Sequence, residues 1–250
     1  MQCTELVQYL NQLLNVEVFH DYAPNGLQVE GKAEVKRIML GVTASQALVD
    51  EAVRWGADML LVHHGWFWKG EPAVITGMKH RRLKALLAAD INLVGYHLPL
   101  DAHPTLGNNA QLALRLGLTP QYQTGESNLL WVGAPAEGTL SGEAFVERVK
   151  HVLEREPIVL GELPAVITKL GWCTGAAQDW IQTAAEEGCQ VYLSGEASER
   201  TTHEAMENGI AYVGAGHHAT ERYGIQALGE HLKETFPELE LRYVEIPNPI

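Results

Sequence analysis

Short apolar strands alternate with amphipathic helices along most of this chain, and this alternation sets the fold class. Residues 35–42 predict a strand, residues 44–55 a helix, and residues 58–62 a second, buried strand. A helix over 79–89 and a strand over 91–96 repeat the order. Strands joined by helices of about 10–15 residues imply a parallel or mixed sheet, so we expect an α/β protein.

The same order of elements occurs a second time. Residues 52–64 resemble residues 184–196, because each segment reads as a helix, a glycine, a strand and a polar pair. Flanking matches join 41–43 to 171–174 and 91–95 to 210–214. We therefore predict two similar α/β lobes, related by an internal duplication or by the sequence pattern that all α/β units share.

The sequence also predicts the boundaries of the two lobes and the segment that connects them. We expect residues 1–125 and 217–250 to form a first lobe that carries most of the metal ligands proposed below, and residues 126–216 to form the second. The polar, turn-rich segment 120–138 reads as a linker. A site with two metal ions would then lie in the cleft.

Composition excludes several classes of protein. Of 250 residues 46% are hydrophobic and 20% charged, which is typical of a globular chain, and the net charge of −13 disfavours nonspecific binding to nucleic acid or anionic membranes. No apolar run approaches the roughly 20 residues of a membrane span, and no signal peptide is recognisable. We expect a soluble, cytoplasmic protein. The three cysteines include no Cys-x-x-Cys pair, which argues against a thiolate zinc site.

Histidines follow the predicted strands. His63 and His64 end the strand that starts at residue 58, and ligand sites in α/β sheets lie beyond the carboxyl ends of strands. Adjacent strand residues point to opposite faces, but both imidazoles can reach one cavity where the chain bends, or each can reach a different ion. The alternative is a pair of polar residues in an exposed turn.

A second pair opens a helix after the predicted strand 210–213. His217 and Glu221 are four residues apart, so they share one helical face, the arrangement that makes such pairs metal ligands. His218 lies about 100° around the helix and should be structural. The alternative for His217 and Glu221 is a surface ion pair.

A third group follows the strand at 91–96. Pro99 interrupts any helical spacing between His97 and Asp101, so we expect a loop to aim both side chains. Asp101 is the better ligand because a carboxylate can bridge two cations, whereas His97 is expected either to contact a metal ligand or to act as a catalytic proton carrier. His103 reads as a surface residue.

Together these signals predict a dinuclear centre. The five candidate ligands are His63, His64, Asp101, His217 and Glu221. Three imidazoles and two carboxylates exceed one tetrahedral site and suit two divalent cations that share a carboxylate, with iron, zinc or manganese ahead of nickel or cobalt. Such a pair would lower the pKa of a bridging water.

Other polar and aromatic residues are candidates for the wall of the site. Glu196 corresponds to His64 in the second lobe and could act as a general acid or substrate anchor, or belong to a capped helix start. Trp66, Phe67 and Trp68 could stack on a ring or form a subunit interface. Asn109 and its neighbour Asn108 could contact a nucleotide or cap a helix, and Cys173 reads as a core residue.

The chain resembles a known family over essentially its whole length. It is similar to the type 2 GTP cyclohydrolase I homologues, also called Ngg-interacting-factor-like proteins, in their short bacterial form. The motifs that carry the resemblance are Asp21–Gly31, Gly41–Ser45, Val62–Gly65, His97–His103, Ser194–Glu199 and Gly214–Glu221.

This resemblance implies a two-lobed α/β fold, a pair of metal ions in the cleft and a toroidal homohexamer. The family's metal ligands fall on the five residues named above. Some members are credited with opening the imidazole ring of GTP, and others are described only as metal-binding proteins or as partners of regulatory factors. The resemblance therefore favours a metal-dependent hydrolase of a small molecule, with a purine nucleotide as the first choice, or a metal-delivery protein that has no substrate of its own.

Overall fold

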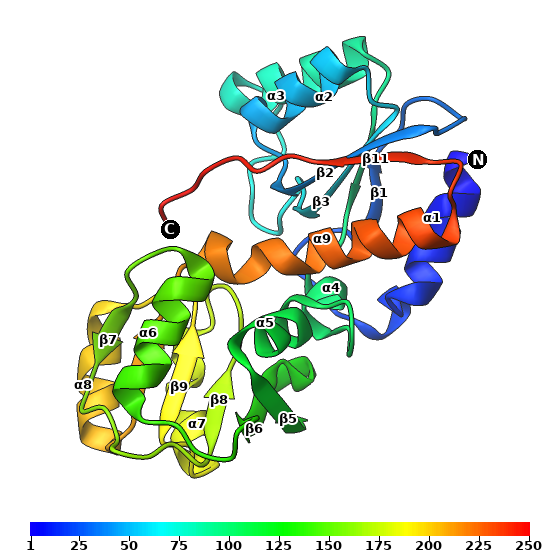
Figure 1. The fold of residues 1–250 in the computed structure, drawn as a ribbon. Coiled ribbons are helices and arrows are strands. Elements are labelled where there is room, and N and C mark those ends of the chain that lie inside the picture. Colours follow the sequence, from blue (N-terminus) through cyan, green and yellow to red (C-terminus); the bar gives the residue numbers. More distant parts are fainter. The chain divides into compact units, whose positions relative to one another are not determined.

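The computed structural model describes residues 1–250, which form an α/β protein with two mixed sheets (Figure 1). The chain divides into two compact units. Unit 1 contains residues 1–107 and 224–247, and unit 2 contains residues 108–223 and 248–250. The predicted α/β class is therefore confirmed.

Unit 1 is built on a five-stranded sheet in the order β1-β4-β3-β2-β11. The strands from β4 to β11 run parallel, and β1 pairs antiparallel with β4. Their bounds are β1 (Gly26–Val29), β2 (Arg37–Thr43), β3 (Met59–His64), β4 (Asn92–Gly95) and β11 (Glu240–Tyr243). Because three of these strands are buried on both faces, they read in the sequence as almost continuous apolar runs.

Helices cover both faces of this sheet. On one face, α1 (Cys3–Leu13) and the part of α9 (His217–Thr235) that belongs to unit 1 pack on side chains such as Leu40 and Leu61. On the other face, α2 (Gln46–Trp55) and α3 (Gly77–Ala88) pack on Leu60 and its neighbours (Figure 1). Successive residues of β3 thus enter opposite cores, as strand alternation requires.

Helix α2 begins and ends where the sequence predicts. The Ser45 hydroxyl accepts a hydrogen bond from the backbone N–H of Leu48 at 3.3 Å and so caps the first turn. Gly56 ends the helix with a φ of 72°, a left-handed conformation that favours glycine. These local signals fix the connection that carries the chain from β2 to β3.

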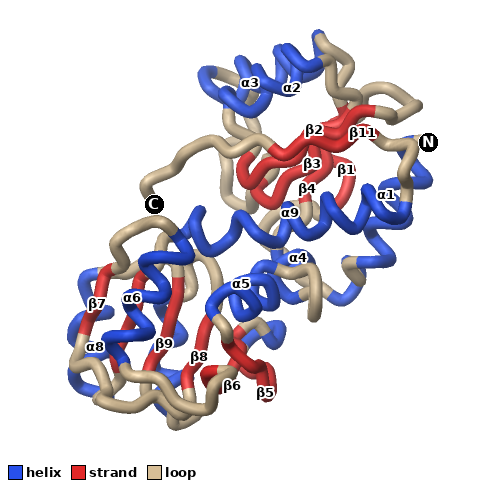
Figure 2. The backbone as a smooth tube through the Cα atoms, in the orientation of Figure 1, coloured by secondary structure: helices blue, strands red, loops and turns tan.

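Unit 2 is built on a six-stranded sheet in the order β5-β6-β8-β9-β10-β7 (Figure 2). Only β8, β9 and β10 are mutually parallel; the other pairings are antiparallel. The bounds are β5 (Leu118–Thr124), β6 (Leu130–Pro135), β7 (Ile158–Leu160), β8 (Leu170–Trp172), β9 (Val191–Ser194) and β10 (Ala211–Gly214).

The helices of unit 2 also cover both faces. One core joins the sheet to α5 (Asn108–Leu116), α6 (Gly142–Leu153) and the first turns of α9. On the other face α7 (Ile181–Glu186) contacts β9 and α8 (Glu199–Asn208) contacts β10. Short helices complete the chain: α4 (Leu98–Ala102) and the 3₁₀ turns η1 (Val16–Val18), η2 (Glu126–Asn128) and η3 (Gln178–Trp180).

The two units share a topology. The series β2-α2-β3-α3-β4 and the series β8-α7-β9-α8-β10 each give three parallel strands in chain order. In each unit an antiparallel strand then joins the third strand of the series, β1 on β4 and β7 on β10. The sequence repeat thus corresponds to a repeat of architecture, while a common origin of the two units stays a prediction.

The unit boundaries differ from the expected ones. Residues 108–125, 217–223 and 248–250, which the sequence assigned to the first lobe, belong to unit 2. The reason is packing: β5 pairs with β6, and Leu112, Ala219 and Tyr223 lie in the core of unit 2. Helix α9 is therefore divided, with residues 217–223 in unit 2 and residues 224–235 in unit 1.

The segment 120–138 is not a linker but most of a β-hairpin. Tyr122 of β5 pairs with Val132 of β6, and Trp131 is buried in the core. Strand β5 lies at the edge of the sheet and five of its seven residues are exposed, which explains why its sequence resembles a loop.

No helix of the chain is both long enough and apolar enough to cross a bilayer.

Candidate metal centre

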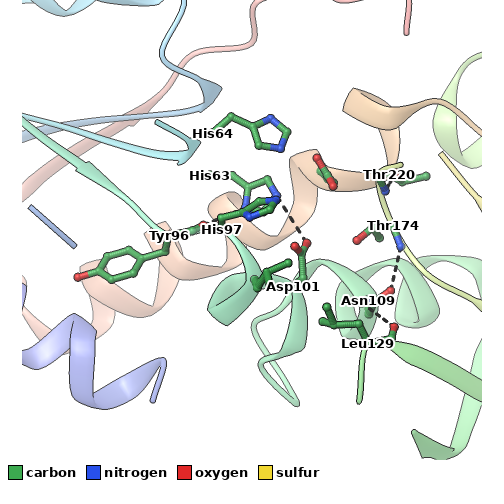
Figure 3. Close-up of polar contacts among 12 residues, drawn as sticks. His63, His64, Tyr96, His97, Asp101, Asn109, Leu129, Thr174 and Thr220 are labelled. Carbon is green, nitrogen blue, oxygen red and sulfur yellow. Dashed lines mark hydrogen bonds and ion pairs between the residues drawn. The ribbon is translucent and has the colours of Figure 1, made fainter. Parts of the chain in front are cut away.

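The end of β3 brings its two histidines together. His64 still pairs with Thr43 of β2, and His63 is 1% exposed. Their ring centroids are nonetheless only 4.4 Å apart, with 40° between the ring planes. Both imidazoles therefore lie close together, although both residues belong to β3 (Figure 3).

His97 joins this pair from the end of β4. Its ring centroid lies 5.3 Å from that of His63 and 5.7 Å from that of His64. One nitrogen from each of the three rings lies within 4.8 Å of the others, a spacing that could hold a metal ion. His97 is thus as well placed to be a ligand as the other two, although the sequence suggested only a proton carrier.

Asp101 sits on a helix and not in the expected loop. Helix α4 includes Pro99 in its first turn, where a missing N–H costs nothing, so the proline does not prevent helical spacing. The backbone N–H of Asp101 donates to the carbonyl of His97 at 3.2 Å. Its carboxylate is 6% exposed and lies 3.5 Å from Nε2 of His63 (Figure 3). Asp101 therefore borders the histidine cluster.

Every histidine of this cluster has its Nδ1 bound to an oxygen. The partner is the Tyr96 carbonyl at 2.9 Å for His63, the Thr43 hydroxyl at 3.2 Å for His64, and Asp21 Oδ1 at 2.7 Å for His97. These contacts fix the ring orientation, and a metal ion would then bind through Nε2.

Asp21 is a residue whose role the sequence did not predict. Besides His97, it accepts hydrogen bonds from the Asn25 amide and from the backbone N–H of Leu98, both at 2.9 Å. Burial by itself would raise its pKa, but the hydrogen bond and charge of His97, with the other donors, lower it to about 2. Asp21 is thus an ionised carboxylate that holds His97. The motif Asp21–Gly31 carries part of the family resemblance, but nothing local in the sequence links Asp21 to His97, 76 residues away.

Unit 2 contributes a second group of donors. His217 begins α9, and its Nε2 lies 3.0 Å from Oε2 of Glu221, one turn along the same helix. Glu221 is 3% exposed, so this pair is not the surface ion pair considered as the alternative. The spacing argument from the sequence therefore predicted the local geometry correctly.

Glu196 holds His217 on the other side of the ring. Its Oε1 lies 2.6 Å from Nδ1 of His217. Burial alone would lower the pKa of His217, but the hydrogen bonds and charges of Glu221 and Glu196 outweigh it and raise that pKa to about 9. Glu196 therefore does for His217 what Asp21 does for His97.

Two glycines make room for this group. A Cβ atom on Gly175 would lie 2.1 Å from Oε1 of Glu221, and the φ of Gly175 is 71°. A Cβ atom on Gly195 would lie 2.7 Å from Cα of His217. The backbone after β8 and β9 thus approaches α9 closely, a requirement that the sequence did not reveal.

The remaining candidates have structural positions. Asn109 is fully buried and its Oδ1 accepts from the backbone N–H of Thr174 at 3.1 Å, so it braces unit 2. Cys173 is buried in the core, as predicted. Trp66 is buried, with its indole N–H on the Ala44 carbonyl at 2.8 Å. Trp68, in contrast, lies edge-on to His97 with ring centroids 4.9 Å apart.

Fold and donors together define a class: an α/β protein with two mixed sheets whose histidine and carboxylate groups could hold metal ions. A family model described as Duf34/NIF3 (NGG1p interacting factor 3) matches residues 1–249, and the chain belongs to this family. The resemblance noted from the sequence is therefore confirmed.

The family includes relatives at about half identity over the full length. The chain is 52% identical over 250 residues to the Escherichia coli K12 protein named "GTP cyclohydrolase 1 type 2 homolog", and the match covers all of both chains. Among solved structures it is similar to protein ybgI, described as of unknown function, with a TM-score of 0.97, 51% identity and full coverage of both chains. The crystal structure of TTHA1606 from Thermus thermophilus matches with a TM-score of 0.90 and 31% identity, again over all of both chains.

Proposed function

We propose that this protein is a dinuclear metal-dependent hydrolase of a small molecule. In this proposal the chain binds two divalent ions, with iron, zinc or manganese as the first candidates. The proposed ligands are His63, His64, Asp101, His217 and Glu221, with His97 as an additional donor whose ring nitrogen lies within 4.8 Å of those of His63 and His64.

The main support is the set of contacts made by Nδ1 of the histidine rings. In His63, His64, His97 and His217 alike, Nδ1 contacts an oxygen of a carbonyl, a hydroxyl or a carboxylate. Metal-binding histidines are typically held in this way, because the second contact fixes both the tautomer and the ring plane. With the buried carboxylate Asp101 in unit 1 and Glu221 in unit 2, these histidines offer nitrogen and oxygen donors that fit hard or borderline divalent cations.

In the proposed hydrolysis, the metal ions and the side chains would have different roles. Divalent ions held there would supply Lewis acidity, which lowers the pKa of water and polarises a substrate. His97 and Glu196 were the candidate catalytic residues. Asp21 contacts Nδ1 of His97 at 2.7 Å and fixes its ring plane, so Nε2 is the atom of His97 that would meet a metal ion or a substrate. Glu196 orients His217 and thereby fixes the direction of Nε2.

A flat ring fits the surroundings of the histidines in unit 1. The Trp68 ring lies 5.8 Å from His64 and 4.9 Å from His97, and the Tyr22 ring, 55% exposed, lies 6.4 Å from His97. Aromatic side chains stack on the bases of nucleotides. Together with the cyclohydrolase name of the Escherichia coli relative, this favours a purine nucleotide, in which the hydrolase would cleave the imidazole ring.

The test uses purified protein stripped of metal and reloaded with each divalent ion. Bound metal is counted, and hydrolysis of a panel of nucleotides and nucleosides is followed. We expect turnover with at least one ion that disappears in Asp101→Ala and Glu221→Ala. Glu234→Ala, an exposed carboxylate of α9, serves as the control and should retain both metal and turnover. Absence of turnover with every ion would contradict the enzymatic proposal.

A metal-delivery protein is the second candidate. The observation that favours it is the position of Glu196: this carboxylate contacts His217 and so is occupied in holding a metal-binding ring. The metal-delivery function predicts the same donors, exchangeable ions and no turnover. Transfer of bound metal to an acceptor apo-enzyme, together with a silent nucleotide panel, would support it.

The proposed assembly rests on the family resemblance alone. We propose a ring-shaped homohexamer in the cytoplasm, with the metal sites facing an inner cavity. Sedimentation of the metal-loaded protein at several concentrations measures its mass, and a stable monomer would contradict the ring.

A further inference from the structure

A cavity of about 310 Å³ lies in unit 1, apart from the histidine cluster. It is formed by the loop after β3 and the first turns of α3. Its lining includes Trp66, Glu71, Val74, Met78, Lys79 and Arg82. A volume of this size is at the lower end of the roughly 300–1,000 Å³ found for small-molecule sites.

Part of the cavity wall consists of apolar side chains that are exposed to solvent. Val74 is 66% exposed and Met78 is 56% exposed. Beside them, Trp66 is almost fully buried, and its indole N–H is already bound to the Ala44 carbonyl. Exposed apolar groups around a concave surface mark a binding site more often than isolated exposed residues do.

Arg82 brings a positive charge that no protein group neutralises directly. Its Nε is buried and has no hydrogen-bond partner, and the guanidinium takes part in no hydrogen bond or ion pair. Burial lowers the pKa of Arg82 more than the charge of Glu71 raises it, but an arginine stays protonated at neutral pH. A buried donor of this kind is costly to leave unpaired.

The other two charged side chains that line the cavity, Lys79 and Glu71, are paired with each other. Lys79 Nζ lies 3.5 Å from Glu71 Oε2 and 3.3 Å from the Pro72 carbonyl, and it sits over the Phe67 ring at 5.1 Å. Lys79 and Glu71 therefore balance each other. The net positive charge at the cavity comes from Arg82.

We infer that this cavity binds a small organic anion that has an apolar body, with a carboxylate on Arg82. The carboxylate accepts from the guanidinium, a pairing whose planar geometry suits two parallel hydrogen bonds. The hydrocarbon or aryl part of the ligand covers Val74, Met78 and Trp66. A bare, strongly hydrated anion such as phosphate would leave these apolar walls in contact with water, so the site selects amphipathic monoanions.

The experiment titrates benzoate and octanoate into the full-length, metal-loaded protein and follows binding by calorimetry and ligand-observed NMR. Benzyl alcohol serves as the neutral probe and inorganic phosphate as the bare anion. Arg82→Met keeps the length of the side chain but removes the charge. Arg81→Met, at the exposed neighbouring position of α3, is the matched control. Thermal unfolding of both variants checks that they fold.

We expect saturable binding of the carboxylates that weakens roughly ten- to a hundredfold in Arg82→Met, the range for a lost charge-assisted hydrogen bond. Binding in Arg81→Met should be unchanged, and binding of benzyl alcohol should be weak and insensitive to Arg82. Three results would overturn the inference: no carboxylate binding, equal binding in Arg82→Met, or phosphate binding as tightly as benzoate. Self-association of the protein that Arg82→Met abolishes would assign the cavity to a second copy of the chain, and so would also overturn it.

Discussion

Asp21 contacts Nδ1 of His97 at 2.7 Å, although 76 residues separate the two along the chain. Asp21 lies before β1, and His97 follows β4. Because β1 and β4 are hydrogen-bonded neighbours that run antiparallel, the start of one strand meets the end of the other. The sheet therefore aligns a carboxylate with a histidine at the candidate metal centre.

The first prediction concerns this pair. Asp21→Asn should keep the fold but remove the charge that orients His97, so metal affinity should fall roughly ten- to a hundredfold. Competition with a chromogenic chelator measures the change. Asp50→Asn, at an exposed position of α2, should bind metal as the parent does. Equal affinity in Asp21→Asn would show that His97 takes no part in metal binding.

The second prediction separates orientation from proton transfer at Glu196. Glu196→Gln retains an oxygen that can accept from Nδ1 of His217, whereas Glu196→Ala leaves that ring without a partner. If Glu196 orients His217, metal affinity should fall roughly ten- to a hundredfold in Glu196→Ala and by less in Glu196→Gln. Chelator competition and the pH dependence of metal binding would be measured for both. Identical losses in the two variants would contradict the orienting role.

The third prediction concerns removal of the metal. Each unit has its own apolar core, so chelation should leave the secondary structure intact. The melting temperature should drop, because ions that bind only the folded state stabilise it by about 2.7 kcal/mol at a concentration a hundred times the dissociation constant. Circular dichroism and thermal scans before and after chelation test this. Global unfolding of the stripped protein would instead assign the ions a purely structural role.

The fourth prediction concerns Asp58 and the way in which the free energy of unfolding depends on pH. Asp58 accepts hydrogen bonds from Lys32 Nζ at 2.7 Å and from the backbone N–H groups of Lys36 and Arg37 at 3.0 and 2.9 Å. Burial would raise its pKa, but these donors outweigh burial and lower it. The group therefore stabilises the fold above its unfolded pKa of about 3.9, and this contribution is lost as the pH falls through the lower folded value.

Asp58→Asn should accordingly reduce the free energy of unfolding by about 1–3 kcal/mol at pH 7. The difference from the parent should stay constant from about pH 8 to pH 5 and shrink below about pH 4. Urea unfolding at pH 7 and pH 3 gives both values. A difference that persists unchanged at pH 3 would mean that the charge of Asp58 contributes nothing.

The fifth prediction tests the aromatic surroundings of His97. Trp68→Ala removes the ring that lies edge-on to this histidine, and it should weaken binding of guanosine by about 1–3 kcal/mol, or roughly five- to 150-fold. Binding of ribose 5-phosphate should change little. Tyr122→Ala, an aromatic of unit 2 that is 39% exposed, is the control. Equal effects on both ligands would argue against ring stacking.

The sequence determined the helices and strands with clear apolar periodicity, and it determined the candidate donors. Apolar runs bounded by Ser45 and Gly56 were sufficient to predict α2, and the spacing of His217 and Glu221 was sufficient to predict their contact. Both follow from local rules, since helix capping and the pitch of a helix depend on residues within one or two turns.

The tertiary structure decided what depends on distant pairing. Whether residues 120–124 form a linker or an edge strand depends on their partner β6, and the contact of Asp21 with His97 depends on the pairing of β1 with β4. The spacing of residues in the sequence also does not predict that Gly175 leaves space for the Glu221 side chain. Local periodicity fixes where most helices and buried strands lie, but which of them become neighbours is set by burial of their apolar faces, and that burial involves residues far apart in the chain.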